Sequence, residues 1–234
     1  MVSNNSSKLK KVAGYLRASF GKKIFCISFQ RTGTTSTGQF FIDHGYSVAT
    51  WAVGKRNKWS VRWIEGDYSK IIRSVDFRFH QVFEDDPWWC GDFYKYIYHQ
   101  VPGSRFVLLE RDADKWFDSM MRHSDRKSLG NTHLHASLYR RESEVHACEQ
   151  ALNNAYTNEF DKLLPLEEQH REHYKSIYVS RIAEIKLFFD KHDSSRIFIG
   201  SLEDKKVWSR LGDFFGFDVA EDYGVHRNNS AVSR

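Results

Sequence analysis

The segment that most constrains the fold of this chain is KIFCISFQRTGTTSTGQFF, residues 23–41. Its first residues are mostly apolar, as expected for a strand buried in a parallel sheet, and a polar turn and a helical pattern follow. The first backbone N–H groups of a helix have no partner inside the helix, so a turn of this kind commonly holds a phosphate or another anion. We therefore predict an anion-binding turn over residues 30–36.

The composition of this turn, QRTGTTS, supports the prediction and excludes a Walker A loop. A Walker A loop needs a second glycine followed by lysine, and this turn has a single glycine and no lysine. Its glycine lets the backbone approach an anion closely, its hydroxyls and amides can donate, and its arginine adds a fixed positive charge. An ordinary strand-to-helix turn with a threonine N-cap is the alternative. The candidate anion-binding residues are Arg31, Thr32, Gly33, Thr34, Thr35 and Ser36.

Buried strands alternate with helical patterns along the chain, which predicts the α/β class. We expect a mostly parallel sheet with helices on both faces, in three layers, and a helical C-terminal half over 141–191. The residues 52–66 and 123–140 are expected to be loops. The expected strands are 23–29, a weaker one at 75–79, 105–110, 196–200 and a short one at 46–50.

Length and composition indicate one domain. The chain has 234 residues, of which 41% are hydrophobic, enough for one sizeable core. We expect an N-terminal helix or extension over 1–22 and a single domain over 23–234. Residues 8–20, KLKKVAGYLRASF, lead into the first strand in the simplest interpretation, and a basic helix on a membrane surface is the alternative.

Charge and cysteine content exclude several classes of partner. The net charge is +5, but Lys and Arg are scattered along the sequence, so a nucleic-acid partner is not expected. The three cysteines lie far apart, and no apolar run is long enough to span a bilayer. We therefore expect a cytoplasmic protein without a membrane span. The sequence does not indicate its oligomeric state.

A second segment, PGSRFVLLERDADKWFDSM, residues 102–120, has the same organisation as the first. Arg111 follows a buried strand at its carboxyl end, and Ser119 lies eight residues later on the next helix. The carboxyl ends of the strands form the edge at which open α/β sheets bind ligands. The sequence thus predicts two strand ends that each present an anion site.

These two segments resemble the donor-binding motifs of sulfotransferases. FQRTGTTS is similar to the loop that holds the 5′-phosphosulfate, which reads PKSGTTW in the cytosolic enzymes, and LLERDADKWFDSM is similar to the strand and helix that hold the 3′-phosphate. The likeness covers most of residues 23–230 and is strongest to a bacterial-type branch. Arg31 stands where the cytosolic enzymes have lysine, and their C-terminal glycine-rich element is absent.

The resemblance implies a P-loop-like fold and a reaction. The donor would be 3′-phosphoadenosine 5′-phosphosulfate (PAPS), the product PAP, and the acceptor a hydroxyl or amine of a small molecule, glycan or lipid. Arg111 and Ser119 would bind the 3′-phosphate, Arg31 would stabilise the leaving 5′-phosphate, and Arg227 in the C-terminal HRNN would reach the donor. No metal is expected.

The resemblance also implies a catalytic base near Pro87. In the cytosolic enzymes a histidine two residues before a proline has this role, which corresponds to Asp85 here, and other branches use glutamate. We therefore rank Asp85 first, then Asp86 and Glu84, with His80 as a rival. The alternative is that the acids cap a helix beginning at Pro87, a role that suits Asp86 best.

Two classes of function remain at this point. The first is a PAPS-dependent sulfotransferase, which needs a base as well as anion sites. The second is a catalytically silent module that binds an adenine nucleotide or a phosphorylated partner and needs only the anion sites. The three adjacent acids favour the enzyme. A nucleotide kinase is disfavoured because the turn lacks the Walker lysine.

Overall fold

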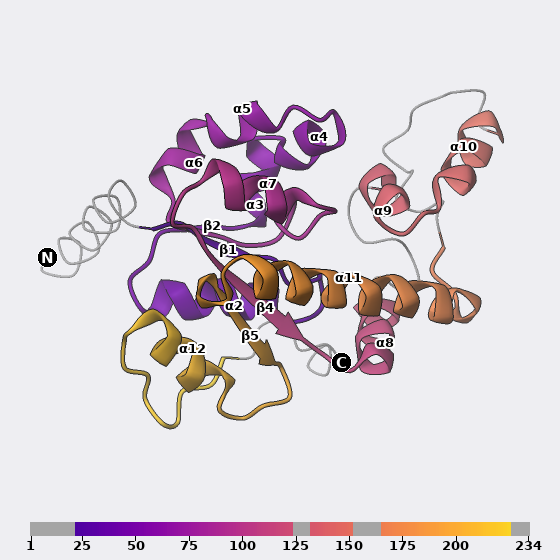
Figure 1. The fold of residues 1–234 in the computed structure, drawn as a ribbon. Coiled ribbons are helices and arrows are strands. Elements are labelled where there is room, and N and C mark those ends of the chain that lie inside the picture. Colours follow the sequence, from indigo (N-terminus) through magenta and orange to yellow (C-terminus); the bar gives the residue numbers. More distant parts are fainter. Residues whose placement is uncertain (1–21, 124–131, 152–164, 226–234) are drawn as a thin grey trace, which may run out of the picture. The chain divides into compact units, whose positions relative to one another are not determined.

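The computed structural model describes residues 22–123, 132–151 and 165–225 (Figure 1). They divide into two compact units, which are described separately. The first holds the described residues up to Glu110 and from Phe189 onward, and the second holds those between Arg111 and Phe188. The residues 1–21 lie outside the described part, so the N-terminal helix and the single domain over 23–234 stay predictions.

The first unit is built on five strands that pair in parallel in the order β2-β3-β1-β4-β5. The central strand is β1, whose Ile24 pairs with Val82 on one side and with Arg105 on the other. The predicted α/β class with a mostly parallel sheet is confirmed. The strands are β1 Ile24–Cys26, β2 Val48–Ala49, β3 Val82–Phe83, β4 Arg105–Glu110 and β5 Ile197–Ser201.

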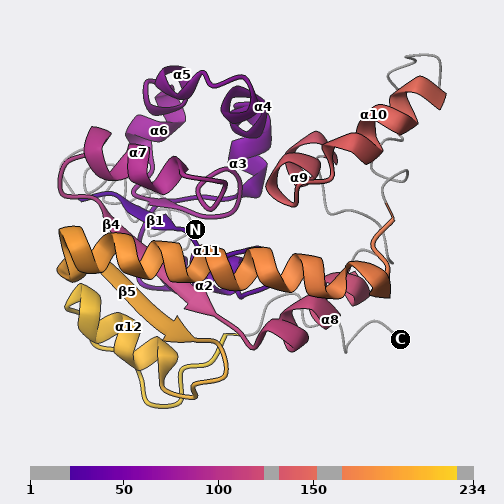
Figure 2. The same ribbon diagram turned by 45° about the vertical axis from the view of Figure 1, so that its right-hand side comes forward.

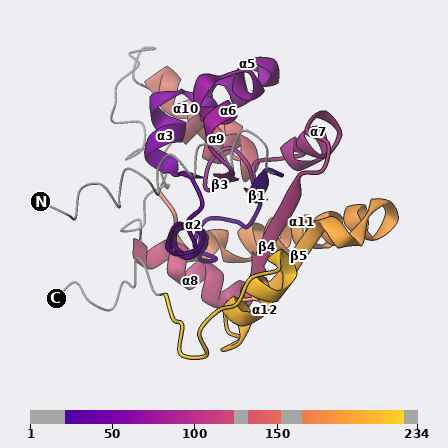
Figure 3. The same ribbon diagram turned by 90° about the vertical axis from the view of Figure 1, so that its left-hand side faces the viewer.

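One face of the sheet packs against α2 (Thr34–Asp43) and α12 (Val207–Phe215), which lie together on that side (Figure 3). Phe40 of α2 stacks on Trp208 of α12 with ring centroids 5.4 Å apart. The strands contribute alternate residues to this core, including Ile24 and Cys26 of β1. Helix α2 is therefore held in place by its apolar side, and the turn that precedes it is fixed at the carboxyl end of β1.

The opposite face of the sheet carries an aromatic core. Phe25, the middle residue of β1, is fully buried and lies 4.9 Å from Phe83 and 5.2 Å from Trp88, measured between ring centroids. Phe106 of β4 lies 4.9 Å from Phe189. Because strand side chains alternate between faces, the same short strands supply both cores.

Four short helices lie between β2 and β3 along the chain, and the sequence did not predict them. The expected loop 52–66 is mostly helical, and the weak strand at 75–79 is wrong, because this segment is a helix. The Ser74 hydroxyl accepts a hydrogen bond from Phe77 N–H and caps that helix, which decides against the alternating strand pattern. The helices are α3 Trp51–Arg56, α4 Trp59–Ile64, α5 Tyr68–Ile72 and α6 Val75–Phe79.

The remaining elements of the first unit are helix α7 (Phe93–Gln100), the C-terminal end of α11, and the 3₁₀ turn η3 (Ser194–Arg196). Asp92 is the N-cap position of α7, so the helix predicted to open at Pro87 begins six residues later. The residues between β3 and α7 form a turn instead. This shift matters for the site, because it removes the proposed capping role of Asp86.

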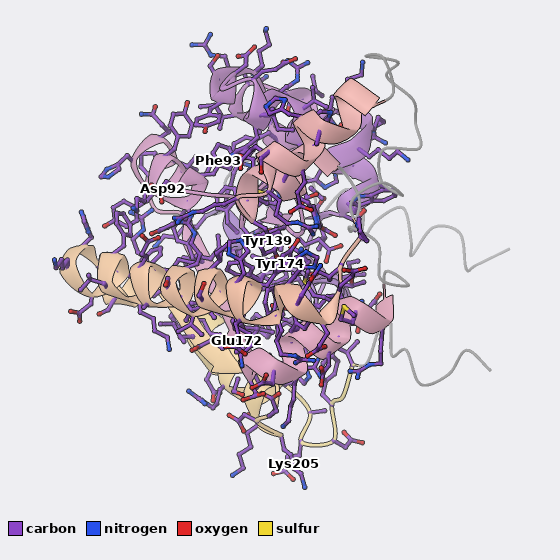
Figure 4. The ribbon with its side chains drawn as sticks, turned by 90° about the vertical axis from the view of Figure 1, so that its right-hand side faces the viewer. Asp92, Phe93, Tyr139, Glu172, Tyr174 and Lys205 are labelled. Atoms are coloured by element: carbon purple, nitrogen blue, oxygen red, sulfur yellow. The ribbon has the colours of Figure 1, made fainter. Side chains whose placement is uncertain are left out.

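The second unit is helical, which confirms the predicted helical C-terminal half. The buried guanidinium of Arg141 donates to the Tyr174 hydroxyl at 3.1 Å, and Tyr139 stacks on Tyr174 at 4.1 Å (Figure 4). Part of the expected loop 123–140 is helical, and residues 124–131 lie outside the described part. The elements are α8 Ala113–His123, α9 Thr132–Leu138, α10 Glu142–Ala151, η2 Glu168–His170 and α11 Arg171–His192, which runs on into the first unit.

The aromatic core predicts a large effect of truncating Phe25. We expect Phe25→Ala to lower the free energy of unfolding by about 3–5 kcal/mol, because the side chain is fully buried and leaves a cavity. Urea unfolding followed by tryptophan fluorescence measures this. Val75→Ala, at a side chain that is 70% exposed, is the control and should change stability by less than about 0.5 kcal/mol. Equal effects of the two substitutions would contradict the assignment of this core.

Candidate active site

The predicted anion turn lies between the carboxyl end of β1 and the amino end of α2. Gly33 is the N-cap residue of α2 and has φ 91°, in the left-handed region that favours glycine. A Cβ added there would lie 2.9 Å from Leu202 Cδ1, so a side chain at this position would also require Leu202 to shift. A glycine N-cap has no side chain with which to cap the helix, which leaves the first turn of α2 accessible to an anion from that direction.

The hydroxyl side chains of the turn divide between structural roles and candidate contacts. Thr32 is fully buried, and both its N–H and its hydroxyl donate to the Phe29 carbonyl, so this hydroxyl closes the turn. The Thr37 hydroxyl donates to the Gly33 carbonyl at 3.0 Å. Thr35 is half-buried, which keeps it within reach of a ligand. The turn thus holds its shape with its own hydroxyls.

Arg31 has an unusual backbone conformation for a residue with a side chain. Its φ is 67°, in the left-handed region, and its side chain is half-buried. A non-glycine residue in this region is strained by about 1–3 kcal/mol, and such strain concentrates at functional sites. In the described residues the other non-glycine residues with positive φ are Lys58, Asp85 and Arg140. Two of the four are therefore candidate catalytic residues.

The three candidate acids follow β3 directly, and β3 is the neighbour of β1 in the sheet. Phe83 pairs with Phe25, so both chains leave the sheet at the same edge. The residues 84–92 between β3 and α7 are called the acidic turn below. The ring centroid of Trp89 in this turn lies 5.3 Å from that of Phe29, which directly precedes the anion turn. The acids and the QRTGTTS turn therefore lie beside each other within this unit.

Glu84 is the most buried of the three acids. It is 6% exposed, and its carboxyl group lies against helix α2. A Cβ added at Gly38 would be 1.9 Å from Glu84 Oε2, so Gly38 leaves the space that the carboxyl group occupies. Burial, and secondarily the charge of Asp85, raises the pKa of Glu84 to about 8. Glu84 is therefore largely protonated at neutral pH.

Asp85 and Asp86 are half-buried and differ in how far their oxygens are used. Asp85 has φ 66°, and its Oδ1 accepts a hydrogen bond from Asp86 N–H at 2.9 Å. Asp86 Oδ1 accepts from the indole N–H of Trp89 at 2.8 Å and faces the Cys90 thiol at 3.9 Å. Burial raises the pKa of both carboxyls. Asp86 thus fixes the acidic turn. It does not cap a helix, which was the alternative role that the sequence suggested for it.

His80 has structural partners. It follows α6 rather than lying in a strand, and its Nδ1 is 2.9 Å from the Ser47 hydroxyl. Its Nε2 lies 3.8 Å from Asp76, and burial lowers its pKa. These contacts occupy both ring nitrogens at the amino-terminal side of β3.

The second predicted anion site, Arg111 and Ser119, lies in the helical unit. The Tyr178 hydroxyl accepts from Arg111 N–H at 2.9 Å and donates to the Arg111 carbonyl at 3.0 Å, which fixes the backbone of this arginine. Trp116 stacks on Tyr178 at 4.3 Å. Ser119 is buried on α8. The predicted residue Arg227 lies outside the described residues.

Sequence reasoning missed three residues that shape these sites. Gly38 had a signal, because a glycine inside a helical pattern often marks a close approach of another group. Trp89 had no signal for the hydrogen bond that its indole donates to Asp86. Tyr178 had no signal at all, since it lies 67 residues from its partner Arg111.

The described part of the chain has neither a cluster of metal-binding side chains nor a helix that could span a membrane. No group of three or more histidine, cysteine or acidic side chains there could hold a metal ion. None of its helices has both the length and the apolar character needed to cross a bilayer. Cys26 and Cys90 are both buried.

The raised pKa of Glu84 predicts a pH dependence of stability. The carboxyl has a pKa near 4.5 in the unfolded chain and about 8 in the folded chain, so the folded chain holds an extra proton between these values. Stability should therefore fall as pH rises from about 4.5 to 8, with a contribution of at most about 1.4 kcal/mol per pH unit. In Glu84→Gln this slope should be smaller, as measured by urea unfolding at pH 5, 6, 7 and 8.

The matched control for this experiment is Glu65→Gln, because Glu65 is exposed at the end of α4. That variant should keep the pH slope of the unchanged protein. An unaltered slope in Glu84→Gln would show that the Glu84 carboxyl does not retain its proton in the folded chain.

Comparison with known proteins identifies the family to which both strand-end segments belong. A model of the Sulfotransferase domain matches residues 23–233, a range that includes the anion turn, the acidic turn and the segment from Arg111 to Ser119. A search of curated proteins found no match. The family match covers most of the chain and both compact units. The chain therefore belongs to the sulfotransferase family.

Proposed function

We propose that this protein transfers the sulfuryl group of PAPS to a hydroxyl or amine of an acceptor. The observation that carries the proposal is the pairing of β1 with β3, which brings a glycine-capped anion turn and a turn of three acids to one edge of the sheet. Sulfuryl transfer needs an anion site for the leaving group and a base for the acceptor. The acceptor class, a small molecule, glycan or lipid, and the bacterial-type branch stay predictions.

In this proposal the anion turn receives the 5′-phosphosulfate end of the donor. Gly33 admits the donor oxygens to the first turn of α2, and Arg31 balances the charge that grows on the 5′-phosphate as the sulfur–oxygen bond breaks. Arginine does not give up its proton at neutral pH, so Arg31 acts through its charge and its hydrogen bonds. The strained backbone of Arg31 supports a functional role for this position.

The 3′-phosphate is proposed to bind Arg111 and Ser119, as the family resemblance implies. The double hydrogen bond between Tyr178 and the Arg111 backbone supports this, because a fixed backbone restricts where the guanidinium can be placed.

Arg227 is retained as a proposed contact to the donor on the family resemblance alone. No metal takes part in the proposed reaction, and a cytoplasmic location also remains a prediction from the sequence.

Asp85 is the proposed base. It would accept the acceptor's proton while an acceptor oxygen or nitrogen forms a bond to sulfur and the bond from sulfur to the 5′-phosphate breaks, which releases PAP. The Glu84 carboxyl is buried against helix α2, and Asp86 is engaged by Trp89, so Asp85 is the better placed of the three. Burial raises the pKa of Asp85, which makes it a stronger base than an exposed aspartate.

A catalytically silent module that binds an adenine nucleotide is the second candidate. It is favoured by the burial of Glu84 and by the use of Asp86 as a hydrogen-bond acceptor, since both reduce the number of available bases. The strained, half-buried Asp85 favours the enzyme. Transfer of labelled sulfate from PAPS to a panel of phenols, sugars, lipids and amines separates the two.

The donor sites predict a preference for the 3′-phosphorylated nucleotide. PAP should bind about ten- to a hundredfold more tightly than AMP, because a charge-assisted hydrogen-bonded contact is worth about 1.5–3 kcal/mol. Calorimetry with both nucleotides measures the ratio. In Arg111→Ala the preference should disappear while the thermal melting temperature changes little, and Arg122→Ala, at an exposed arginine of the same helix α8, is the control. Equal affinities for PAP and AMP in the unchanged protein would rule out the 3′-phosphate site.

The proposed base predicts a loss of turnover without a loss of donor binding. Asp85→Asn should reduce turnover by about 10²–10⁴-fold and leave PAP affinity nearly unchanged. The unchanged protein should also lose activity as pH falls through the raised pKa of Asp85, because the protonated carboxyl cannot accept a proton. Asp86→Asn and Glu84→Gln are the comparison variants. If one of them loses turnover while Asp85→Asn does not, the role belongs to that neighbour.

A further inference from the structure

The four helices α3–α6 carry an excess of positive charge. Residues 51–80 contain seven lysines and arginines but three acids, an excess of four in a chain whose net charge is +5. Six of these cations are exposed, whereas Glu65 is the one acid of the segment that is exposed. The cations are separated along the sequence, and the fold places them on or beside the four helices. The exposed cations are Lys55, Arg56, Lys58, Lys70, Arg73 and Arg78.

Exposed apolar side chains concentrate on the same helices. Five of the eight large hydrophobic side chains that are exposed in the described residues lie between residues 51 and 79. Trp51 is 50% exposed and Val75 is 70% exposed. Single exposed apolar residues are ordinary, but their concentration on one helical segment is not expected from chance placement. The five are Trp51, Val61, Ile64, Val75 and Phe79.

Helices α3–α6 lie together next to the β2 and β3 edge of the sheet (Figures 1 and 2). Hydrogen bonds connect the first two of these helices to the last one. Asn57 donates to Asp76 Oδ2 at 2.6 Å, and the Trp59 indole donates to the Ser74 hydroxyl at 3.2 Å. These bonds bring residues 56–59 next to residues 73–76. Lys58 and Arg73 are both exposed and each is next in sequence to one of the bonded residues, so they lie on adjacent parts of the chain.

Within α3 and α6 the cations and the exposed apolar side chains share a face. Lys55 lies over the Trp51 ring at 4.8 Å, four residues away. Val75 precedes Arg78 by three residues in α6, a spacing that places two side chains on one side of a helix. Lys58, Arg73 and Arg78 form no ion pair with any described residue, so their charge is not neutralised within this part of the chain.

We propose that this surface of α3–α6 binds the headgroup region of an anionic lipid bilayer. Cations attract anionic headgroups, and interspersed apolar side chains enter the boundary with the acyl chains. An acidic glycan would meet the cations equally well but would leave Val61, Ile64 and Val75 in water. The interleaving of apolar and cationic side chains therefore favours a lipid surface. This surface is independent of the proposed transfer reaction.

Sedimentation with vesicles tests the proposal on the full chain. Vesicles of phosphatidylcholine with 30 mol% phosphatidylserine should bind the protein, whereas phosphatidylcholine alone should bind it weakly, and added salt should weaken binding. The variant Lys58→Gln/Arg73→Gln/Arg78→Gln should lower the partition coefficient on the order of a hundredfold. Circular dichroism checks that each variant is folded.

The matched control removes the same charge elsewhere in the same unit. Lys191, Lys205 and Lys206 are exposed outside α3–α6, and Lys205 points away from the body of its unit (Figure 4). Lys191→Gln/Lys205→Gln/Lys206→Gln should keep binding within about threefold. Residues 1–21 are present in every variant, so a difference between the two triple variants reports on α3–α6.

A second variant tests the apolar part without changing the charge. Val61→Ser/Val75→Ser should weaken binding severalfold, and the loss should persist at high salt, where the electrostatic contribution is screened. Equal losses in the two triple variants would overturn the proposal, as would binding of the protein to heparin without binding to the anionic vesicles.

Discussion

The site of this protein depends on the parallel pairing of β1 with β3 and on the close contact that it makes possible between Glu84 and Gly38. The pairing brings the anion turn and the acidic turn to one edge of the sheet. The carboxyl group of Glu84 then fills the space that Gly38 leaves on helix α2, one turn after the anion turn. Any larger residue at position 38 would displace the acid, the helix or both, so the two halves of this site are mechanically connected.

The three acids show how one short turn gives similar side chains different properties. Glu84 is buried against helix α2, and desolvation raises the pKa of its carboxyl group. Asp86 accepts hydrogen bonds that fix the turn through Trp89, whose ring also contacts Phe29 of the anion turn. Asp85 keeps a half-buried position in a strained backbone conformation. Local environment, rather than residue type, therefore separates the candidate base from its neighbours.

The helices α3–α6 add a feature that catalysis does not need. They cover the β2 and β3 edge with short amphipathic turns whose inner residues, such as Trp59 and Phe77, are buried in the aromatic core. Their outer residues are cationic and apolar, and hydrogen bonds between the helices collect them on one surface. Exposed valine and isoleucine side chains add no stability to the fold, so the proposed binding role explains this surface better.

The sequence by itself determined the α/β class and the strand-to-helix transitions at residues 23–41 and 105–120, because buried strands and glycine-containing turns leave strong local patterns. It did not determine the helices at 51–79, where an alternating pattern at 75–79 indicated a strand and a Ser74 cap decided for a helix. Nor did it predict the contact of Glu84 with Gly38 or of Tyr178 with Arg111. Such contacts join residues 46 and 67 positions apart, and only tertiary packing brings them together.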